Sequence, residues 1–364
     1  MILMSTYALG EIPFKNVYLH GLVRDEQGRK ISKSLGNNID PQDMIAKYGT
    51  DAIRLSLLVG SAPGQDTRLS EAKIEGFRNF TNKLWNIARF MLMQLAEPSS
   101  DNGPVSLADE WILARLQQTI QDVTKKFEAY EFSTAAELLR DFTWNDVADW
   151  YLEIAKVEKN KHAILGQLLQ SLLKMWHPFM PFVTEELWQR AKFDGLLMVA
   201  EWPSATVQEA PSSLFNSLRQ LVTDMRRLRL EKNVDATKKV IFAIASDDAR
   251  QLELVRGQSA WMERLTNAQE LQFIDTLPTD WPTVISGSLS VALDLSGAID
   301  VEAEQARLQK EIESTQAYVS SLESRLANQE FISKAPAKVV DDMRAKLSEA
   351  QAKLAQLDGR IKND

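Results

Sequence analysis

Residues 77–91 read FRNFTNKLWNIARFM, and the apolar members of this stretch recur mostly at steps of three and four residues. An α-helix turns once in about 3.6 residues, so one of its faces would carry Phe77, Phe80, Leu84, Ile87, Ala88 and Met91. The same spacing returns in Trp111, Leu113, Leu116, Ile120, Val123 and Phe127. The pattern predicts a mainly α fold, with helices throughout residues 70–233.

Short breaks divide this helical segment into about five helices. They fall at residues 98–104, 130–131 and 177–181, where prolines or turn-forming residues interrupt the spacing. Because the connections are short, consecutive helices should pack as an antiparallel bundle. We expect its tryptophans in the core rather than at a base-stacking surface: Trp85, Trp111, Trp144, Trp150, Trp176 and Trp188.

The carboxy-terminal segment carries two heptad arms, from Val301 to Leu326 and from Val340 to Ile361. A short break at residues 333–336 separates them. Matched arms favour an antiparallel coiled-coil hairpin, roughly 40 Å long at a rise of about 1.5 Å per residue, over pairing between two chains.

Between the bundle and the hairpin, β-branched and apolar runs predict strands at residues 240–244, 271–274 and 291–295. A helical stretch near residues 260–265 lies between the first two strands. This region is expected to form a small α/β module.

The first segment is expected to be the end of an α/β domain. Runs at residues 17–19 and 21–23 predict a strand, and residues 25–28 a turn. Asp40 and Pro41 predict the N-cap and first residue of a helix, and a second helix should begin near residue 51. Two or three strands cannot cover their own apolar faces, so most of the sheet is expected to be missing.

Residues 28–37 read GRKISKSLGN and place two lysines and two hydroxyls in one loop. Lys30 and Lys33 offer mobile positive charges, and Ser32 and Ser34 offer short donors. The glycines at both ends allow sharp turns and close approach to a ligand. The loop predicts a polyphosphate site, with ATP as the favoured ligand; a basic surface turn is the alternative.

Composition restricts the remaining choices. The chain has 364 residues, a formal charge of −8, three histidines and no cysteine. Disulfides and thiolate zinc sites are thereby excluded, and no metal site is indicated. No apolar run approaches the roughly 20 residues of a membrane span, so we expect a cytoplasmic protein.

A basic cluster could provide local contacts for nucleic acid despite the acidic net charge. Its members crowd the end of one predicted helix and the segment that follows: Arg219, Arg226, Arg227, Arg229, Lys232, Lys238 and Lys239. A solvated helical face is the simpler interpretation.

Five stretches of the sequence match motifs of one known protein family. Residues 30–34, KISKS, match a Lys-Met-Ser-Lys-Ser signature with isoleucine in place of methionine, and residues 48–54, YGTDAIR, continue it. Residues 64–66, 177–188 and 326–339 match later segments. Together these motifs resemble the class I aminoacyl-tRNA synthetases, and within them the valine branch.

This resemblance implies ATP-dependent attachment of valine to tRNA(Val) through a valyl-adenylate. It implies Lys33 first and Lys30 second as catalytic residues that meet the leaving pyrophosphate, with Ser32 and Ser34 also binding ATP. Mg²⁺ would be carried by the nucleotide, with no metal bound by the protein. The resemblance also implies a monomer with no membrane contact.

The resemblance divides the chain into four parts. Residues 1–69 would end a Rossmann-like α/β catalytic domain and contact the tRNA stem. Residues 70–233 would form the helical anticodon-binding domain, 234–298 a small α/β linker module, and 299–364 a tRNA-binding coiled-coil arm.

The family's His-Ile-Gly-His signature and inserted editing domain do not occur in this sequence. We therefore expect Met1 to lie partway through a catalytic domain, and the chain to be inactive alone. An isoleucine-type fragment is one alternative, although its usual cysteine-rich tail is absent; a tRNA-binding module without chemistry is another. Asp51 and Arg54 could contact the inner corner of tRNA, but an N-cap is favoured for Asp51.

Overall fold

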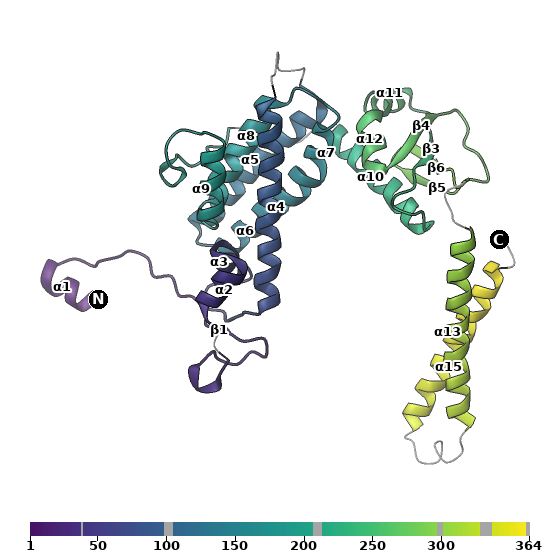
Figure 1. The fold of residues 1–364 in the computed structure, drawn as a ribbon, viewed down its shortest axis with the longest axis horizontal. Coiled ribbons are helices and arrows are strands. Elements are labelled where there is room, and N and C mark those ends of the chain that lie inside the picture. The colour runs from purple at the N-terminus through teal and green to yellow at the C-terminus, as the bar shows by residue number, and fades with distance from the viewer. Residues whose placement is uncertain (38, 98–104, 207–212, 297–300, 328–336, 362–364) are drawn as a thin grey trace. The chain divides into compact units, whose positions relative to one another are not determined.

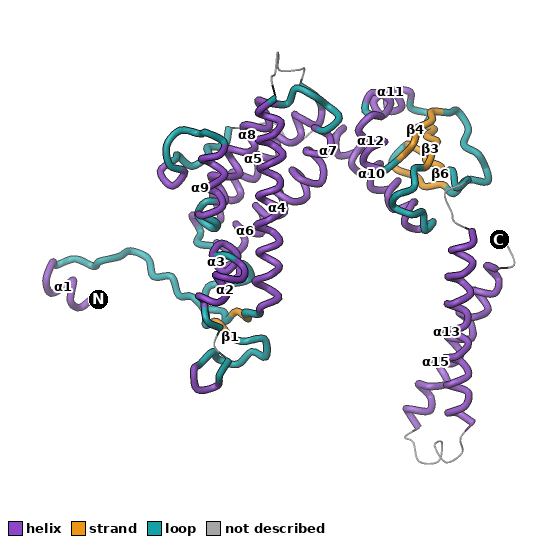
Figure 2. Tube along the Cα trace, in the orientation of Figure 1, coloured by secondary structure: helices purple, strands orange, loops and turns teal. Residues whose placement is uncertain are grey.

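The computed structural model describes residues 1–37, 39–97, 105–206, 213–296, 301–327 and 337–361, and Figure 1 shows its elements along the chain. The chain divides into two compact units. The first comprises Met1–Val222 and Gln258–Leu265, and the second comprises Thr223–Gly257 and Thr266–Asp364. Helices prevail among these residues (Figure 2), so the predicted mainly α class is confirmed. Within the described ranges, no helix is long and apolar enough to cross a membrane.

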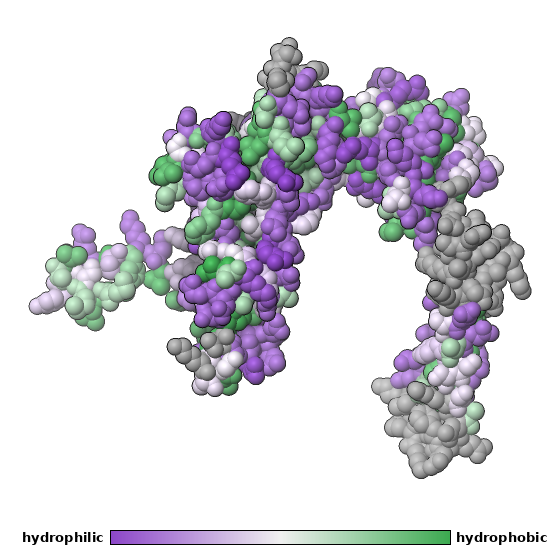
Figure 3. Space-filling model, viewed as in Figure 1, coloured by the Kyte–Doolittle hydropathy of each residue, from purple (hydrophilic) through white to green (hydrophobic). Residues whose placement is uncertain are grey.

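The first unit begins with α1 (Ile2–Leu9), which buries none of its residues. Figure 3 shows apolar side chains gathered over this helix, and Met1, Leu3 and Tyr7 are among the most exposed large side chains of the described chain. The helix therefore depends on its own backbone hydrogen bonds rather than on packing.

The strand expected across residues 17–23 is largely wrong. Only β1 (Val23–Arg24) forms, pairing in parallel with β2 (Thr67–Arg68). Before it, the backbone makes isolated bonds: the Gly64 amide donates to the Leu19 carbonyl, and the Leu22 amide donates to a side chain, the carboxylate of Asp66. An amide that donates to a side chain cannot also donate to a neighbouring strand, so the strand cannot extend towards residue 17.

Two short helices follow. The helix α2 (Pro41–Tyr48) has the predicted cap, since the Asp40 carboxylate accepts from the Gln42 amide at 2.8 Å. Its successor α3 (Thr50–Leu58) is capped by Gly49, so Asp51 lies inside the first turn and the N-cap predicted for it is wrong. A small core made by Tyr48, Ala52, Leu69 and Ile74 joins these helices to the start of the bundle.

The bundle is made by the long helices α4 and α5 and the shorter elements that pack on them (Figure 1). Its π-helical segment η2, in which the backbone turn is wider, was not predicted. The bounds are α4 (Glu71–Ala96), α5 (Leu107–Glu128), α6 (Phe132–Asp141), η2 (Phe142–Tyr151), α7 (Leu152–Ala155), α8 (His162–Trp176), α9 (Pro181–Arg190) and η3 (Leu197–Val199). The helix α10 (Ser213–Glu231) begins in the first unit and ends in the second.

Most of the bundle tryptophans are buried, as expected: Trp111, Trp150, Trp176 and Trp188. The prediction is wrong for Trp85 and Trp144. Trp85 is half-buried beneath the Arg190 guanidinium, and Trp144 is 38% exposed, with Phe80 and the Lys83 ammonium against its ring. Cations cover part of both rings, which helical spacing alone does not reveal.

The second unit contains a four-stranded sheet in the order β4-β3-β6-β5. The strands are β3 (Val240–Ala245), β4 (Ala268–Phe273), β5 (Thr283–Ser286) and β6 (Leu289–Leu293). The first two strands pair in parallel, and the other pairs are antiparallel. Three of these strands and the helix α12 (Ser259–Thr266) were predicted, whereas β5 and the helix α11 (Ala249–Gly257) were not.

The heptad arms form α13 (Val301–Ala327) and α15 (Ala337–Ile361), which pack against one another (Figure 1). Ile312 of α13 packs against Leu354 of α15, and the Gln351 amide donates to the Glu323 carboxylate at 3.0 Å. From Ile312 forward to Glu323 along α13, the partner on α15 moves back from Leu354 to Gln351, so the two helices run in opposite directions, as an antiparallel hairpin requires. The predicted turn at 333–336 lies outside the described residues.

Candidate nucleotide site

The lysine–serine loop grows from a tight turn. The turn predicted at residues 25–28 is present: the Gly28 amide donates to the Asp25 carbonyl at 2.9 Å, and Gly28 has a φ of 79°. Only glycine adopts that backbone conformation without strain. Beyond the turn, Lys30 forms an antiparallel bridge with Arg24. The bridge fixes the point at which the loop leaves β1.

Asn37 closes the loop from the other side. Its side-chain oxygen accepts from the Ser32 amide at 3.0 Å, and its side-chain nitrogen donates to the Lys30 carbonyl at 3.2 Å. The same nitrogen donates to the Asp25 carboxylate at 2.9 Å. One amide therefore binds the turn and both ends of the Lys30–Ser32 backbone.

Asp25 anchors the turn beneath this clamp. Its carboxylate accepts from the amides of Gln27 and Arg29 and from the Arg29 guanidinium as well as from Asn37. The Asn37 bond, together with those from Arg29, lowers the pKa of Asp25 from 3.8 to about 2. The carboxylate is thus charged at any physiological pH.

The predicted ATP-binding residues lie on this clamped loop. Lys30 is exposed and has no ion pair among the described residues, and the Ser32 and Ser34 hydroxyls lie 3.2 Å apart. Lys33 begins the short 3-10 helix η1 (Lys33–Leu35), but its side chain is outside what the structure describes. The loop brings the Ser32 and Ser34 hydroxyls together and carries the exposed Lys30, a set of donor groups suited to phosphate oxygens.

A second anchor holds the strand behind the loop. Arg24 donates through Nε to the Asp66 carboxylate at 2.5 Å and through Nη1 to the Gly28 carbonyl at 3.3 Å. Sequence reasoning gave neither Asp66 nor Asn37 a role. Both lie in the quoted motifs, but Asp66 binds Arg24 across 42 residues, and Asn37 binds residues 5, 7 and 12 positions away, intervals that match no periodic element.

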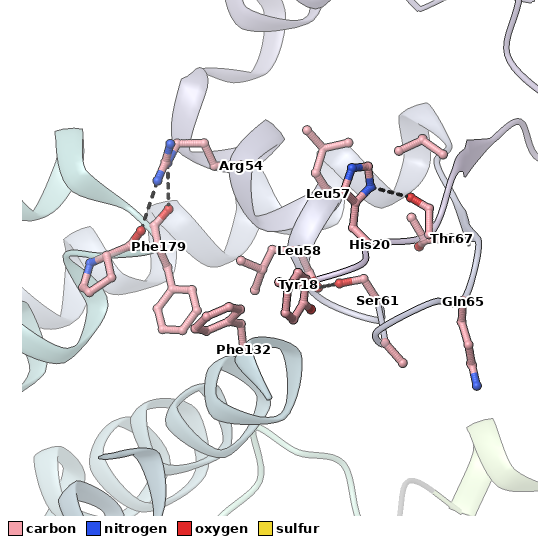
Figure 4. A pocket seen from close by; sticks show the side chains of 14 residues that line it. Tyr18, His20, Arg54, Leu57, Leu58, Ser61, Gln65, Thr67, Phe132 and Phe179 are labelled. Atoms are coloured by element: carbon pink, nitrogen blue, oxygen red, sulfur yellow. Dashed lines mark hydrogen bonds between the residues drawn. The ribbon is translucent and has the colours of Figure 1, made fainter. Parts of the chain in front are cut away.

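A pocket of about 440 Å³ lies beside β1 and β2, between α3 and the α8–α9 connection. Figure 4 shows Tyr18, Phe132 and Phe179 along its apolar side, and Arg54 at its rim. At its floor, a Cβ on Gly21 would lie 1.6 Å from the Gln65 carbonyl oxygen. Only glycine fits there.

The basic cluster predicted near the end of α10 is not a uniform surface patch. The Arg229 guanidinium is buried and donates to the carbonyls of Asn267, Asp235 and Lys238. Arg219 lies over the rings of Trp111 and Trp150, 4.7 and 4.9 Å from their centres. Both cations therefore have structural roles, which a charge count cannot distinguish from solvated ones.

The chain's described portion contains no group of three or more histidine, aspartate and glutamate side chains arranged to hold a metal ion. The loop itself offers ammonium and hydroxyl groups, which are donors rather than the carboxylate ligands that Mg²⁺ prefers. Its chemistry suits the phosphates of a nucleotide.

Removing the clamp should change the titration of Asp25. In Asn37→Ala we expect the pKa of Asp25 to rise from about 2 towards 3.8, because its largest stabilising hydrogen bond is lost. A lowered folded pKa stabilises the loop above 3.8, and that contribution is lost as the pH falls through about 2. Carbon-detected NMR titration of the carboxyl group measures the shift.

The control for this titration is Ser34→Ala, because Ser34 is exposed and makes no hydrogen bond to Asp25 in the described structure. Its Asp25 pKa should stay near the wild-type value. An unchanged Asp25 pKa in Asn37→Ala would contradict the clamp.

Three family models match the chain. The one described as "tRNA synthetases class I (I, L, M and V)" matches residues 1–70. "Anticodon-binding domain of tRNA ligase" matches residues 109–244. "Valyl tRNA synthetase tRNA binding arm" matches residues 300–363. The matched ranges include the lysine–serine loop, much of the bundle and the coiled-coil hairpin.

The chain is also similar to complete proteins. The valine–tRNA ligase of Bacillus cereus is 41% identical over 365 residues, covering 95% of this chain and 41% of that protein. The valine–tRNA ligase of Bacillus subtilis is 38% identical over 386 residues, covering 99% and 44%. The chain therefore spans less than half the length of these relatives.

Among solved structures, LeuRS of Agrobacterium radiobacter K84, in a ternary complex with tRNA and LeuAMS, is 22% identical with a TM-score of 0.48. That likeness covers 68% of this chain and 28% of the other.

Proposed function

Since the chain belongs to the class I aminoacyl-tRNA synthetases and corresponds to the carboxy-terminal part of valine–tRNA ligases, we propose that it acts in the ATP-dependent attachment of valine to tRNA(Val). The chain supplies the loop that binds ATP and the surfaces that bind tRNA. The remaining catalytic residues come from the amino-terminal part that the relatives have.

The clamped loop at residues 28–37 carries this proposal. It presents the Lys30 ammonium and the Ser32 and Ser34 hydroxyls from a backbone closed by Asn37. A polyphosphate is a dense set of anionic oxygens, and such donors match it. Lys33 lies in the same loop, three residues after Lys30, at the start of η1.

The reaction explains why two lysines are useful. A carboxylate oxygen of valine forms a bond to the α-phosphorus of ATP, and the bond between that phosphorus and the pyrophosphate oxygen breaks. The adenylate then passes valine to a hydroxyl at the tRNA 3′ end and releases AMP. Lys33 and Lys30 neutralise the charge that grows on pyrophosphate. Mg²⁺ would arrive with the nucleotide and share that neutralisation.

The other parts of the chain serve the tRNA. In this proposal residues 1–69 complete the catalytic domain, and residues 70–233 bind the anticodon arm of the tRNA. Residues 234–298 link this bundle to the coiled-coil arm, and residues 299–364 contact the outer corner of the tRNA. The family models for an anticodon-binding domain and a tRNA-binding arm support this division. We place the enzyme in the cytoplasm as a monomer.

On the coiled-coil hairpin, one groove suits RNA. It has a volume of about 530 Å³ and is lined by Ser314, Thr315, Tyr318, Lys346, Glu349, Ala350 and Lys353. The Tyr318 ring is 48% exposed between small side chains, so a base or ribose can stack on it. Lys346 and Lys353 of α15 line the same groove and can bind the phosphates of the RNA.

We expect this chain to bind a valine tRNA transcript more tightly than an isoleucine tRNA transcript at fixed salt. Lys346→Gln and Lys353→Gln should weaken both complexes alike, because phosphate contacts carry no sequence information. Each substitution should reduce the slope of log K against log salt by about 1. Fluorescence titration at several salt concentrations gives both quantities.

Glu349→Gln is the matched control, since it removes the groove's negative charge and should not weaken binding. Equal affinity for the two tRNAs would contradict the valine assignment. An unchanged salt slope in both lysine variants would contradict the assignment of this groove to RNA.

A further inference from the structure

Asp51 of α3 binds the first turn of another helix. Its carboxylate accepts from the Val183 amide at 2.7 Å and from the Phe182 amide at 3.4 Å, both at the amino-terminal end of α9. These are amides that a helix cannot satisfy from within. Asp51, which is only 5% exposed, therefore caps α9 from α3, across intervals of 131 and 132 residues in the sequence.

Arg54, one turn later on α3, binds the end of the preceding helix. Its guanidinium donates through Nε to the Phe179 carbonyl at 3.2 Å and through Nη2 to the Pro178 carbonyl at 3.0 Å. Figure 4 shows Arg54 reaching these two carbonyls at the rim of the pocket. Both carbonyls follow α8, which ends at Trp176.

The two charges match the two helix ends. A helix carries partial positive charge at its amino terminus and partial negative charge at its carboxy terminus. Asp51 meets the positive end of α9, and Arg54 meets carbonyls beyond the negative end of α8. Four hydrogen bonds from one turn of α3 thus fix both sides of the α8–α9 connection.

The opposite side of α3 faces the loop-bearing segment. Ala52 belongs to the small core with Tyr48, against which Val23 and Ile39 also pack. Val23 and Ile39 flank the lysine–serine loop in sequence. The short helix α3 therefore lies between that loop's supports and the bundle.

We propose that Asp51 and Arg54 are positioning residues that hold the tRNA-binding bundle in a fixed orientation to the loop-bearing segment. This inference rests on the proposed function. A tRNA held by the bundle must bring its 3′ end to an adenylate formed elsewhere, so a small rotation at this joint displaces the reacting hydroxyl. A misplacement of about 1 Å can cost on the order of 10²-fold in rate. Valine and ATP need no such alignment with the bundle.

Three variants test the joint in an enzyme that contains this chain and the amino-terminal part of its relatives. Asp51→Asn keeps an acceptor for one amide of α9 but turns an NH₂ group towards the other. Burial raises the pKa of Asp51, so a neutral side chain of the same shape is tolerated by the fold. Arg54→Gln removes both carbonyl contacts, whereas Arg54→Lys retains the charge.

We expect Asp51→Asn and Arg54→Gln to lower kcat/KM for tRNA aminoacylation by about 10- to 100-fold, mostly in kcat. Valine-dependent ATP–pyrophosphate exchange should stay within about 3-fold of wild type, and Arg54→Lys should recover part of the loss. Glu270→Gln, at an exposed residue of β4 in the linking part of the chain, is the control and should leave both activities unchanged.

The outcomes separate the two proposals. If the unsubstituted enzyme does not charge tRNA(Val), the proposed function is wrong. If the unsubstituted enzyme does charge tRNA(Val), two results would show that the joint has no positioning role. One is that the variants lose pyrophosphate exchange and tRNA charging equally, and the other is that they lose neither activity. Circular dichroism and thermal unfolding of each variant distinguish an altered joint from a lost fold, and a variant that unfolds at the assay temperature counts against the inference.

Discussion

Replacing Lys33 with alanine should lower valine-dependent ATP–pyrophosphate exchange by on the order of 10²-fold or more, the scale seen when one transition-state donor is removed. The measurement needs an enzyme that joins this chain to the amino-terminal part of its relatives. Lys30→Ala should have the smaller effect of the two.

The expected loss of rate follows from the moment at which negative charge develops on the pyrophosphate. Negative charge moves onto the pyrophosphate oxygens as their bond to the α-phosphorus breaks, so an ammonium group that meets them then is worth more in the transition state than in the bound substrate. The loss should therefore appear in kcat, with a smaller change in the KM for ATP. A loss confined to KM would mean that Lys33 merely binds the nucleotide.

Two comparisons sharpen this test. Lys33→Arg keeps the charge but replaces a compact point charge with a planar fork, so its rate should lie between those of wild type and alanine. Lys15→Ala removes an exposed lysine outside the loop and should leave exchange unchanged. Exchange near the wild-type rate in Lys33→Ala would overturn the assignment.

Replacing Lys161 with alanine should lower the free energy of unfolding of the bundle by about 3–5 kcal/mol. The Lys161 ammonium lies 2.5 Å from the Asp109 carboxylate and 2.9 Å from that of Glu158. The side chains of Lys161 and Asp109 are 7% and 1% exposed. Urea unfolding followed by tryptophan fluorescence measures the loss.

The cost arises because Asp109 would remain as a buried, unpaired charge. Tyr151 still donates to it at 2.7 Å, but a hydroxyl cannot replace a cation. Burial alone would lower the pKa of Lys161, yet its bonds to Asp109 and Glu158 raise it overall. A raised lysine pKa stabilises the fold fully below 10.5, and that stabilisation is lost as the pH rises through the folded value.

The double variant Lys161→Met with Asp109→Asn is the control, because it removes both charges together. It should be more stable than Lys161→Ala, since the Asp109 carboxylate, which is 1% exposed, is no longer left as an unpaired charge. A single variant as stable as wild type would show that the buried pair contributes nothing.

Periodicity predicted the helices well because burial on one face is a repeating local signal. Phe80, Leu84 and Ile87 lie in the core where their spacing places them. The cap at Asp40 and the hairpin arms follow from equally local rules. The strand expected at residues 17–23 failed because a strand needs a partner, and the Asp66 carboxylate takes an amide that a ladder would use.

The contacts that shape the loop and its support could not be predicted, because they follow no regular interval: 5, 7 and 12 residues at Asn37, and 131 and 132 residues at Asp51. Asn37 resembles any polar loop residue until Asp25 and Ser32 are brought to it. Asp51 has the residue type of an N-cap, and it does cap a helix, but that helix is α9 rather than its own. The sequence indicated that Asp51 would cap a helix, whereas the helix that it caps depends on the tertiary fold.

The contacts that Arg219 and Arg229 make within the protein have a consequence for the rate of association with RNA. The chain's formal charge is already −8, and these two cations contact aromatic rings and backbone carbonyls of the protein itself. The long-range field around the molecule is therefore repulsive to an RNA polyanion, and it reaches about 10 Å at 0.1 M salt. Under the proposed function, capture of tRNA would depend on contacts made within that distance, so the association rate should fall short of the electrostatically steered limit.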